Sequence, residues 1–322
     1  MKFINAEEVA GALPMQALIA SLEAAFAHRF VAPPRHQHLI RRDGYRDSTL
    51  LLMPAWTDAA SPRPYIAVKL MALVPGDDAL SPHLDSSVLL YDGAKGGLLA
   101  VMDGNAVTAR RTVATSVLAA RYLARSASEN LLIVGAGRVA RLLHEGYRTA
   151  FPIRKVKVWD INEAWAARLV ADLRSQGVDA ALAAYLEQAA RAADIITSAT
   201  RSTTPRIEGR WLKPGVHLDL IGSFTPQMRE CDDEAFLRSS IFVDTPKAVS
   251  DSGDLAQPIE AGVADAGHIK GTLAELCSGS LKGRTAADQI TLFKTIGSAI
   301  ADLAAAKLVH EAVRSEMVHA TL

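Results

Sequence analysis

The sequence predicts an α/β protein in which a doubly wound parallel sheet is joined to an α+β domain. Three observations support this fold class. From residue 131 onward, short apolar runs alternate with helical segments, which is typical of βαβ units. Before residue 105, strand-like runs are separated by Pro and Asp-Gly turns, which favours an antiparallel sheet. The length of 322 residues suits two domains.

The first part of the chain is expected to form a helix followed by antiparallel strands. Apolar residues at helical spacing predict a helix over residues 14–30, which must end before Pro33 and Pro34. Strands are expected over residues 49–53, 65–70, 87–91 and 98–102. The first of them stops at Pro54, and the last two stop at Asp-Gly pairs, a hairpin signal.

In the second part, a helix over residues 108–124 leads into the parallel sheet. Unbroken apolar runs predict buried parallel strands over residues 131–134, 156–159, 194–197, 216–221 and 241–243. Helices are expected over residues 138–150, 163–175 and 185–192. The tail, residues 286–317, is expected to be one long amphipathic helix that packs on the first domain. The predicted domains are therefore residues 1–120 with 300–322, and residues 121–299.

The composition argues against several classes of protein. Lys+Arg and Asp+Glu both number 35, so the basic surplus of a nucleic-acid binder is absent. No run approaches the ~20 apolar residues that span a bilayer, and the N-terminus lacks the apolar core of a signal peptide. Neither Cys231 nor Cys277 has a nearby His at metal-ligand spacing. We therefore expect a cytoplasmic protein that binds no metal, nucleic acid or membrane.

The strongest local motif is the G-x-G-x-x-A sequence of residues 135–140, which follows an apolar strand and precedes a helix. In a Rossmann-type domain the first Gly permits a tight turn, and the second lets the backbone approach a pyrophosphate. The small Ala140 lets the helix pack closely on the strand, and the pyrophosphate binds the N–H groups of the helix start. The sequence therefore predicts a Rossmann-type domain that binds a nicotinamide dinucleotide.

Asp160 ends the second strand of that domain, where an acidic residue binds the adenosine ribose. A carboxylate accepts hydrogen bonds from the ribose hydroxyls and repels a 2′-phosphate, which favours NAD(H), with NADP(H) as the alternative cofactor. Asp160 has a second interpretation, in which it only caps the helix over residues 163–175.

Three cations of the first domain are candidates for an anion pocket. Arg35 follows two prolines, Lys69 lies inside an apolar strand, and Arg111 lies in a helix. A lysine on an edge strand or a solvent-facing position would explain Lys69 equally well. Arg110 and Arg111 point about 100° apart on a helix, so we expect only one of them to face the site.

These features together resemble the ornithine cyclodeaminase/mu-crystallin family of NAD(P)-dependent enzymes. The sequence MDGNAVTARRTVA, residues 102–114, is specific to that family. The resemblance extends over nearly the whole chain, through VKLMALVPGD (68–77), GGLLAVMDGNAVTARRTVATSVLAARYLAR (96–125), LLIVGAGRVA (131–140), WLKPGVHLDLIGS (211–223), SGDLAQPI (252–259) and TLFKTIGSAIADLAAAKLV (291–309).

The resemblance implies a homodimer that acts on small amino or imino acids. In this family the N-terminal α+β domain and the C-terminal helix form the dimer interface and the substrate floor, and the Rossmann domain holds the nicotinamide. Members include ornithine cyclodeaminases, alanine dehydrogenases and reductases of cyclic imino acids. Their shared step is hydride transfer between nicotinamide and a carbon that bears a carboxylate and an amine or imine.

The resemblance also implies roles for individual residues. Arg35, Lys69 and Arg111 match the pocket for the substrate carboxylate, and Lys69 and Arg111 are the candidate catalytic residues. A water molecule and Lys69 are both candidate donors of the proton to the imine nitrogen. The positions that match cofactor contacts are Ser87, Arg111, Thr112, Gly135, Gly137, Arg138, Val139, Asp160, Thr200, Ile221, Gly222, Ser223 and Thr295, the last of them expected in the final helix.

Phe224 departs from the pattern of the ornithine cyclodeaminases, which carry an aspartate at this position. Phenylalanine moves no proton and pairs with no ammonium, so we expect it to contact the substrate of an imino-acid reductase, such as pyrroline-2-carboxylate or piperideine-2-carboxylate. The alternatives are ornithine cyclodeaminase, alanine dehydrogenase and a crystallin-like binding protein. If Phe224 instead packs in the core, another acid such as Asp85 or Glu230 would have to serve.

Overall fold

The computed structural model describes all residues except 29, 42, 45–46, 59–60, 75–82 and 321–322. It divides the chain into unit 1, Met1–Arg111 with Ser298–Leu322, and unit 2, Thr112–Gly297. One boundary between the units lies between residues 111 and 112, inside α3 (Gly104–Leu123), and the other lies between residues 297 and 298. The end of the family-like stretch over residues 68–77 lies outside the described residues.

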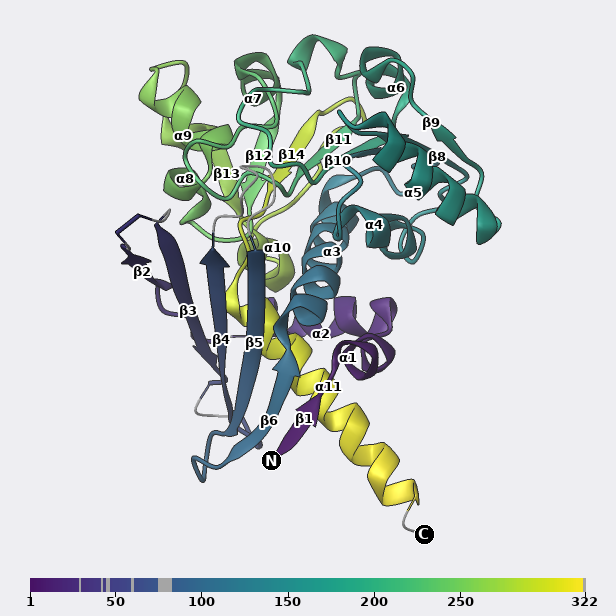
Figure 1. Cartoon of the computed structure of the whole chain (residues 1–322). Helices are drawn as coiled ribbons and strands as arrows, with labels where there is room; N and C mark the ends of the chain where they lie inside the picture. The colour runs from purple at the N-terminus through teal and green to yellow at the C-terminus, as the bar shows by residue number, and fades with distance from the viewer. Residues whose placement is uncertain (29, 42, 45–46, 59–60, 75–82, 321–322) are drawn as a thin grey trace. The chain divides into compact units, whose positions relative to one another are not determined.

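Unit 1 contains a six-stranded sheet in the order β1-β6-β5-β4-β3-β2 (Figure 1). Neighbouring strands are antiparallel except for the parallel pair of β1 and β6. The sheet thus agrees with the predicted antiparallel arrangement and adds β1 and β2. The strands are β1 (Lys2–Ile4), β2 (His36–Ile40), β3 (Ser48–Trp56), β4 (Tyr65–Val74), β5 (His83–Asp92) and β6 (Leu98–Asp103).

Two turn signals of unit 1 act differently from the prediction. β3 continues through Pro54. On the β2 side of β3, regular pairing ends at Leu52, and the next pair is the Val31–Trp56 bridge. Pro54 lies in this gap, where its missing N–H breaks no hydrogen bond of the sheet. The Asp92-Gly93 turn does join β5 to β6 as a hairpin. Asp103, by contrast, starts a helix, because its carboxylate accepts the N–H of Ala106 in the first turn of α3 at 2.7 Å.

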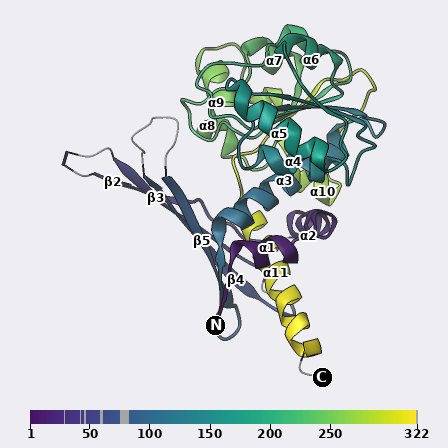
Figure 2. The ribbon, with the colours of Figure 1, turned by 45° about the vertical axis from the view of Figure 1, so that its right-hand side comes forward.

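Three helices of unit 1, α1 (Ala6–Ala12), α2 (Met15–Ala27) and α11 (Ala299–Ala320), lie on one face of this sheet (Figure 2). Leu18, Leu22 and Phe26 of α2 are buried, as their spacing predicts. α11 packs against α2 and crosses β3, β4 and β5. Among the described residues no single helix could cross a membrane; α1 and α2 together have the length and composition, but they bend by 77°.

Unit 2 contains an eight-stranded, all-parallel sheet in the order β13-β12-β14-β11-β10-β7-β8-β9, which confirms the predicted α/β fold with a Rossmann-type doubly wound sheet. The strand order reverses direction at β7, between β8 and β10, which is the switch point where such sheets bind ligands. The strands are β7 (Asn130–Val134), β8 (Lys155–Trp159), β9 (Ala180–Leu182), β10 (Ile195–Ser198), β11 (His217–Leu220), β12 (Ser240–Val243), β13 (Ile269–Thr272) and β14 (Thr291–Lys294).

Helices accompany the strands of unit 2 much as the sequence predicts. α4 and α6 contact β7, and α5 contacts β8 and β9. The helices are α4 (Ala140–Tyr147), α5 (Glu163–Ser175), α6 (Leu186–Ala192), α7 (Asp233–Arg238), α8 (Ala248–Asp251), α9 (Gly253–Glu260) and α10 (Leu273–Ser278), with 3-10 turns at Gly209–Trp211 and Ala266–His268.

The predicted single tail helix is wrong over its first part. Residues Thr291–Lys294 form β14, a fully buried strand between β11 and β12, and α11 begins only at Ala299. Gly297 adopts a φ of 90° between them, a backbone conformation that a helix cannot contain. The sequence of β14 does not alternate between apolar and polar residues. Its periodicity therefore did not distinguish this buried strand from the helix that follows.

Candidate functional site: a dinucleotide loop and a buried cationic cluster

The glycine loop connects β7 to α4 with the geometry that the sequence predicts. Gly135 has a φ of 106° and donates its N–H to Trp159 at 2.7 Å, and a Cβ there would lie 2.7 Å from the carbonyl oxygen of Ala199. A Cβ at Gly137 would meet nothing within 4 Å, so the backbone at this position is open to a ligand. Ala140 is buried where the helix packs on the strand. These features fit the pyrophosphate of a dinucleotide.

Asp160 is tied directly to this loop. Its carboxylate accepts the N–H of Ala136 and the N–H of Asn162, both at 2.8 Å. Asn162, and not Asp160, is the cap of α5, because its side chain accepts the N–H groups of Ala164 and Trp165. The helix-capping interpretation of Asp160 is therefore wrong. Each carboxylate oxygen keeps a second lone pair, so Asp160 can also accept ribose hydroxyls.

Two exposed arginines lie beside the glycine loop. Arg138 follows Gly137, and Arg201 follows Thr200, whose neighbour Ala199 touches the loop. Partial burial lowers the pKa of Arg201 below its usual value, and the positive charge of Arg138 lowers it further. Two cations held close together favour an anion such as a diphosphate. The other predicted loop residue, Val139, is half-buried and precedes α4.

Thr200 and Gly222, at the ends of β10 and β11, are joined by one buried side chain. Glu230 accepts the N–H and Oγ1–H of Thr200 at 2.8 and 2.7 Å, the Ser198 hydroxyl at 2.6 Å and the Gly222 N–H at 2.6 Å. A Cβ at Gly222 would lie 1.7 Å from the Thr200 carbonyl oxygen, so only glycine fits here. Glu230 therefore connects the loops that follow β10 and β11, which contain residues predicted to contact the cofactor.

Lys294 places a positive charge beside this glutamate. Its Nζ lies 3.9 Å from Glu230 and 3.3 Å from Asp254, and all three side chains are fully buried. Asp254 in turn accepts the N–H of Glu230 at 2.6 Å and that of Cys231 at 3.1 Å. Burial raises the pKa of Glu230, and the Lys294 charge opposes that rise. We refer to Glu230, Asp254 and Lys294 as the acidic brace.

Two other predicted cofactor residues have their side-chain hydroxyls engaged within unit 2. Ser223 is buried and donates to the carbonyl of Met228 at 2.6 Å, so its hydroxyl serves the loop itself. Thr295 is buried and donates to Asp244 at 2.6 Å. Thr295 directly follows β14 and is not part of the final helix, which corrects its predicted place. Ile221, at the end of β11, is buried and donates its N–H to Ser198.

In unit 1, Lys69 is neither an edge residue nor solvent-facing. It lies in β4, flanked by β3 and β5, and is 1% exposed. Its Nζ lies 2.8 Å from an oxygen of Asp302, and Arg111 places its Nε 2.8 Å from the other oxygen. An ammonium group has three N–H donors, so Lys69 can donate to a ligand in addition to its ion pair with Asp302.

Asp302 lies against both Lys69 and Arg111, and the sequence analysis did not identify it. It lies in the first turns of α11 and is 1% exposed. The available signal was a lone acid in the apolar, alanine-rich segment AIADLAAAK, since a charge in such a segment needs a partner. We refer to Lys69, Arg111 and Asp302 as the cationic cluster.

Burial is the largest influence on Lys69 and lowers its pKa to about 8. Asp302 opposes this shift, whereas the charges of Arg111 and Arg35 add to it. Arg35 is half-buried just before β2, and its charge also acts on Lys69; that Arg35 belongs to the same pocket stays a prediction. The pKa of Asp302 is lowered, because Arg111 and Lys69 outweigh the effect of its burial.

The remaining predicted residues take varied positions. Arg110 donates to the Leu13 carbonyl at 2.9 Å and does not point with Arg111, as expected. Ser87 is exposed on β5 in unit 1, and Thr112 is buried in α3 at the start of unit 2. Phe224 is half-buried in the turn after β11.

Three acids that could replace the aspartate absent at Phe224 have hydrogen-bond partners of their own. Glu230 is used in the acidic brace. Asp85 accepts the N–H of Ser86 and the amide of Asn105. Asp219 accepts three hydroxyls, and burial raises its pKa to about 6; the donors are Ser116, Thr197 and Tyr147.

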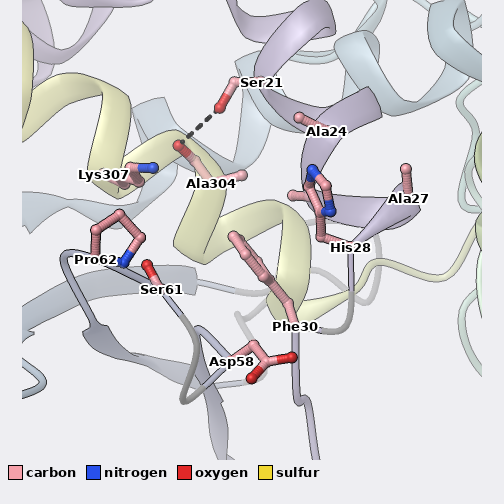
Figure 3. A pocket seen from close by; sticks show the side chains of 11 residues that line it. Ser21, Ala24, Ala27, His28, Phe30, Asp58, Ser61, Pro62, Ala304 and Lys307 are labelled. Carbon is pink, nitrogen blue, oxygen red and sulfur yellow. Dashed lines mark hydrogen bonds between the residues drawn. The ribbon is translucent and has the colours of Figure 1, made fainter.

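A separate cavity of about 690 Å³ lies in unit 1, between α2, α11 and the segment around Ser61 (Figure 3). Lys307 and Pro62 line one side and His28 the other, with Phe30 between them. None of the predicted site residues lines it. In the part of the chain that the structure describes, no group of three or more His, Cys, Asp or Glu could hold a metal ion.

The parallel sheet and glycine loop of unit 2 have the features of a Rossmann-type dinucleotide-binding domain. Residues 1–317 match the model of the ornithine cyclodeaminase/mu-crystallin family, and the chain belongs to this family.

Several relatives of known name resemble the protein over nearly its whole length. The chain is 32% identical to a Delta(1)-pyrroline-2-carboxylate reductase of Colwellia psychrerythraea, over 97% of this chain and 99% of the relative. Its structure matches Delta(1)-pyrroline-2-carboxylate reductase of Thermococcus litoralis in complex with NADH and L-proline, with a TM-score of 0.90, 32% identity and 98% of each chain covered. An archaeal alanine dehydrogenase dimer with bound NAD matches with a TM-score of 0.88 and 29% identity, over 98% of this chain and 96% of that chain.

Proposed function

We propose that the protein is an NAD(P)H-dependent oxidoreductase that reduces the C=N bond of a small cyclic imino acid, such as pyrroline-2-carboxylate or piperideine-2-carboxylate. The observation that carries this proposal is the buried cationic cluster, in which Lys69 can donate to a ligand in addition to its ion pair with Asp302. The names of two relatives, both pyrroline-2-carboxylate reductases, support the same substrate class.

The cationic cluster and Arg35 would bind the substrate carboxylate. Lys69 and Arg111 both lie against Asp302, and the charge of Arg35 also acts on Lys69, so the positive charge gathered here would attract an incoming anion. Arg111 donates its Nε–H to Asp302, and a guanidinium matches the geometry of a carboxylate. A positive floor under the substrate also draws electron density from the adjacent imine, which favours hydride addition to its carbon.

Imine reduction adds a hydride to the carbon and a proton to the nitrogen. The reduced nicotinamide supplies the hydride when it is bound. Lys69, with a pKa of about 8, is acidic enough to give a proton to the imine nitrogen as the C=N bond becomes a single bond. The neutral lysine then takes up a proton from water, which completes the balance.

Phe224 favours reduction over cyclodeamination. Releasing ammonia from ornithine requires proton transfers at two amino groups, and a general acid/base contributes about 10²–10⁴ to such steps. Phe224 provides no such group, and Glu230 accepts four hydrogen bonds within unit 2. The aromatic ring can instead pack against the apolar part of a cyclic substrate.

Asp160 and the structural relatives support NAD(H) as the cofactor. The Asp160 carboxylate would accept the ribose hydroxyls and repel a 2′-phosphate. The two matched structures contain NADH and NAD, respectively.

A homodimer formed by unit 1 is part of this proposal. The face of β4 opposite Lys69 carries the apolar side chains of Ile66, Val68 and Leu70, which are only half-buried, and Leu39 on β2 is 54% exposed. Such apolar surface favours association. The alanine dehydrogenase neighbour is a dimer. A location in the cytoplasm stays a prediction.

The test is steady-state oxidation of NADH by purified protein with a panel of cyclic imino acids, with NADPH in parallel. We expect turnover with pyrroline-2-carboxylate or piperideine-2-carboxylate, and weak or absent ammonia release from L-ornithine with NAD. Robust proline formation from L-ornithine would establish a cyclodeaminase instead. Binding of cofactor and imino acid without turnover would support a crystallin-like binding protein.

A further inference from the structure

Asp302 connects three elements of unit 1 at one point. It belongs to α11, which arrives from the far end of the sequence, and it contacts Lys69 on β4 and Arg111 on α3. The two oxygens take one cation each, both at 2.8 Å, and all three side chains are at least 95% buried. Because this carboxylate is buried, water screens its interaction with the two cations only weakly.

We propose that Asp302 is a positioning residue of the substrate site, which keeps Lys69 protonated and fixes Arg111 through its Nε so that both cations face a substrate carboxylate. The inference rests on the proposed function and adds to it a residue that determines how the site responds to pH.

Among the described residues, Asp302 supplies the negative charge that acts most strongly on the ammonium group of Lys69. Burial and the positive charges of Arg111 and Arg35 all favour the neutral amine, and Asp302 opposes them. The neighbours of Lys69 across the sheet, Met53 on β3 and Val88 on β5, carry no charge. Without Asp302 we therefore expect Lys69 to lose its proton at a lower pH.

Asp302 also determines how Arg111 is presented. A guanidinium has one edge that includes Nε and one that carries the terminal nitrogens. Because Nε donates to Asp302 at 2.8 Å, the side chain is held in one orientation. A carboxylate can therefore be bound without first ordering the arginine, which lowers the entropic cost of binding.

The test compares Asp302→Asn with Asp302→Glu in the full-length protein. For each variant and the wild type, kcat/KM for pyrroline-2-carboxylate is measured from about pH 5.5 to about pH 9.5 in steps of roughly half a pH unit. The pH dependence of kcat/KM reports the pKa values of the free enzyme. The wild type should lose activity as pH rises through about 8. For Asp302→Asn we expect this midpoint to move about 1–3 units toward acid, because an opposite charge at this distance shifts a pKa by that amount.

Asp302→Glu keeps the charge and is the control. It should lower kcat/KM by misplacing the carboxylate while leaving the midpoint near that of the wild type. Ionisation of the substrate is the same for all variants, so it does not contribute to the difference. The affinity for NADH, measured by fluorescence titration, should stay within about threefold of wild type in both variants.

The outcomes separate this inference from the proposed function. A wild type that reduces no imino acid would contradict the proposed function. An active wild type with an unshifted midpoint in Asp302→Asn would contradict the inference alone. If Asp302→Asn does not fold, the triple variant Lys69→Met/Arg111→Met/Asp302→Asn should fold, because neither buried cation is then left without Asp302. Failure of both variants to fold would contradict the inference, since Asp302 would then act independently of the two cations.

Discussion

The protein contains two buried clusters made of the same kinds of residue, and they have opposite charge balance. In the cationic cluster of unit 1, Lys69 and Arg111 face the single carboxylate of Asp302. In the acidic brace of unit 2, Lys294 faces two carboxylates, Glu230 and Asp254. Each cluster places a lysine beside a carboxylate, so the pairing alone does not indicate a substrate site.

The difference lies in what completes each cluster. In the acidic brace, Glu230 accepts hydroxyls and backbone N–H groups near the ends of β10 and β11, and Asp254 accepts two further backbone N–H groups. In the cationic cluster, the two cations outnumber the one carboxylate of the cluster, Asp302. We therefore interpret the acidic brace as a support for the fold and propose the cationic cluster as the site for an anionic ligand.

The largest expected effect is the loss of activity on removing a cation of the cationic cluster. Lys69→Met and Arg111→Met should each lower kcat/KM for the imino acid by about 10²–10³, the effect of losing one buried stabilising group. Lys69→Met should change NADH affinity less than Arg111→Met does. Lys294→Met is the matched control, since it removes a buried lysine from the acidic brace: it should lower the melting temperature and spare more of the activity. Near wild-type kcat/KM in both unit 1 variants would show that the proposed pocket is wrong.

A smaller effect is expected from the acidic brace, and it should fall on the cofactor. In Glu230→Gln the amide nitrogen cannot accept a hydrogen bond, so either Gly222 or Thr200 loses its buried partner, at a cost of about 1–3 kcal/mol. If the two loops contact the cofactor as proposed, NADH should bind roughly 5–100-fold more weakly by fluorescence titration.

Asp254→Asn is the control for this variant. Asp254 belongs to the same brace but contacts neither Thr200 nor Gly222, and an asparagine oxygen can still accept the N–H groups of Glu230 and Cys231. It should destabilise the fold with little change in NADH affinity. Equal weakening in the two variants would mean that the brace acts through general stability and does not position the loops.

The smallest effect concerns the choice of cofactor. The wild type should use NADH with a higher kcat/KM than NADPH, because Asp160 repels a 2′-phosphate. Asp160→Ala should reduce that preference by roughly tenfold, the equivalent of about 1.4 kcal/mol. Equal or better use of NADPH by the wild type would mean that Asp160 faces away from the ribose or that Arg138 receives the phosphate.

The sequence predicts the fold well where local patterns carry the information. The glycine loop, the capped α5 and the strands β7, β8, β10 and β11 follow from short motifs and apolar runs. β14 was missed because a fully buried strand and the first turn of a buried helix have the same apolar composition. The start of α3 at Asp103 was missed because Asp-Gly favours a turn and Asp also caps helices.

The candidate site could be predicted only in part. Lys69 stood out, because a lysine in an apolar strand needs a partner, but its partner Asp302 lies 233 residues further along the chain, at position 302 against 69. No local pattern links residues so far apart. The same is true of Glu230, whose role depends on loops that meet only when the parallel strands are side by side.

The central claim is that the cationic cluster binds the carboxylate of the substrate, and its most direct test compares two rings. Pyrroline-2-carboxylate and 1-pyrroline share the ring and the C=N bond, and only the first carries a carboxylate. The wild type should prefer the carboxylated ring by about 10²–10³ in kcat/KM, and Lys69→Met should reduce this ratio by tenfold or more, roughly 1.4 kcal/mol. A ratio that is the same in the wild type and in Lys69→Met would contradict the account.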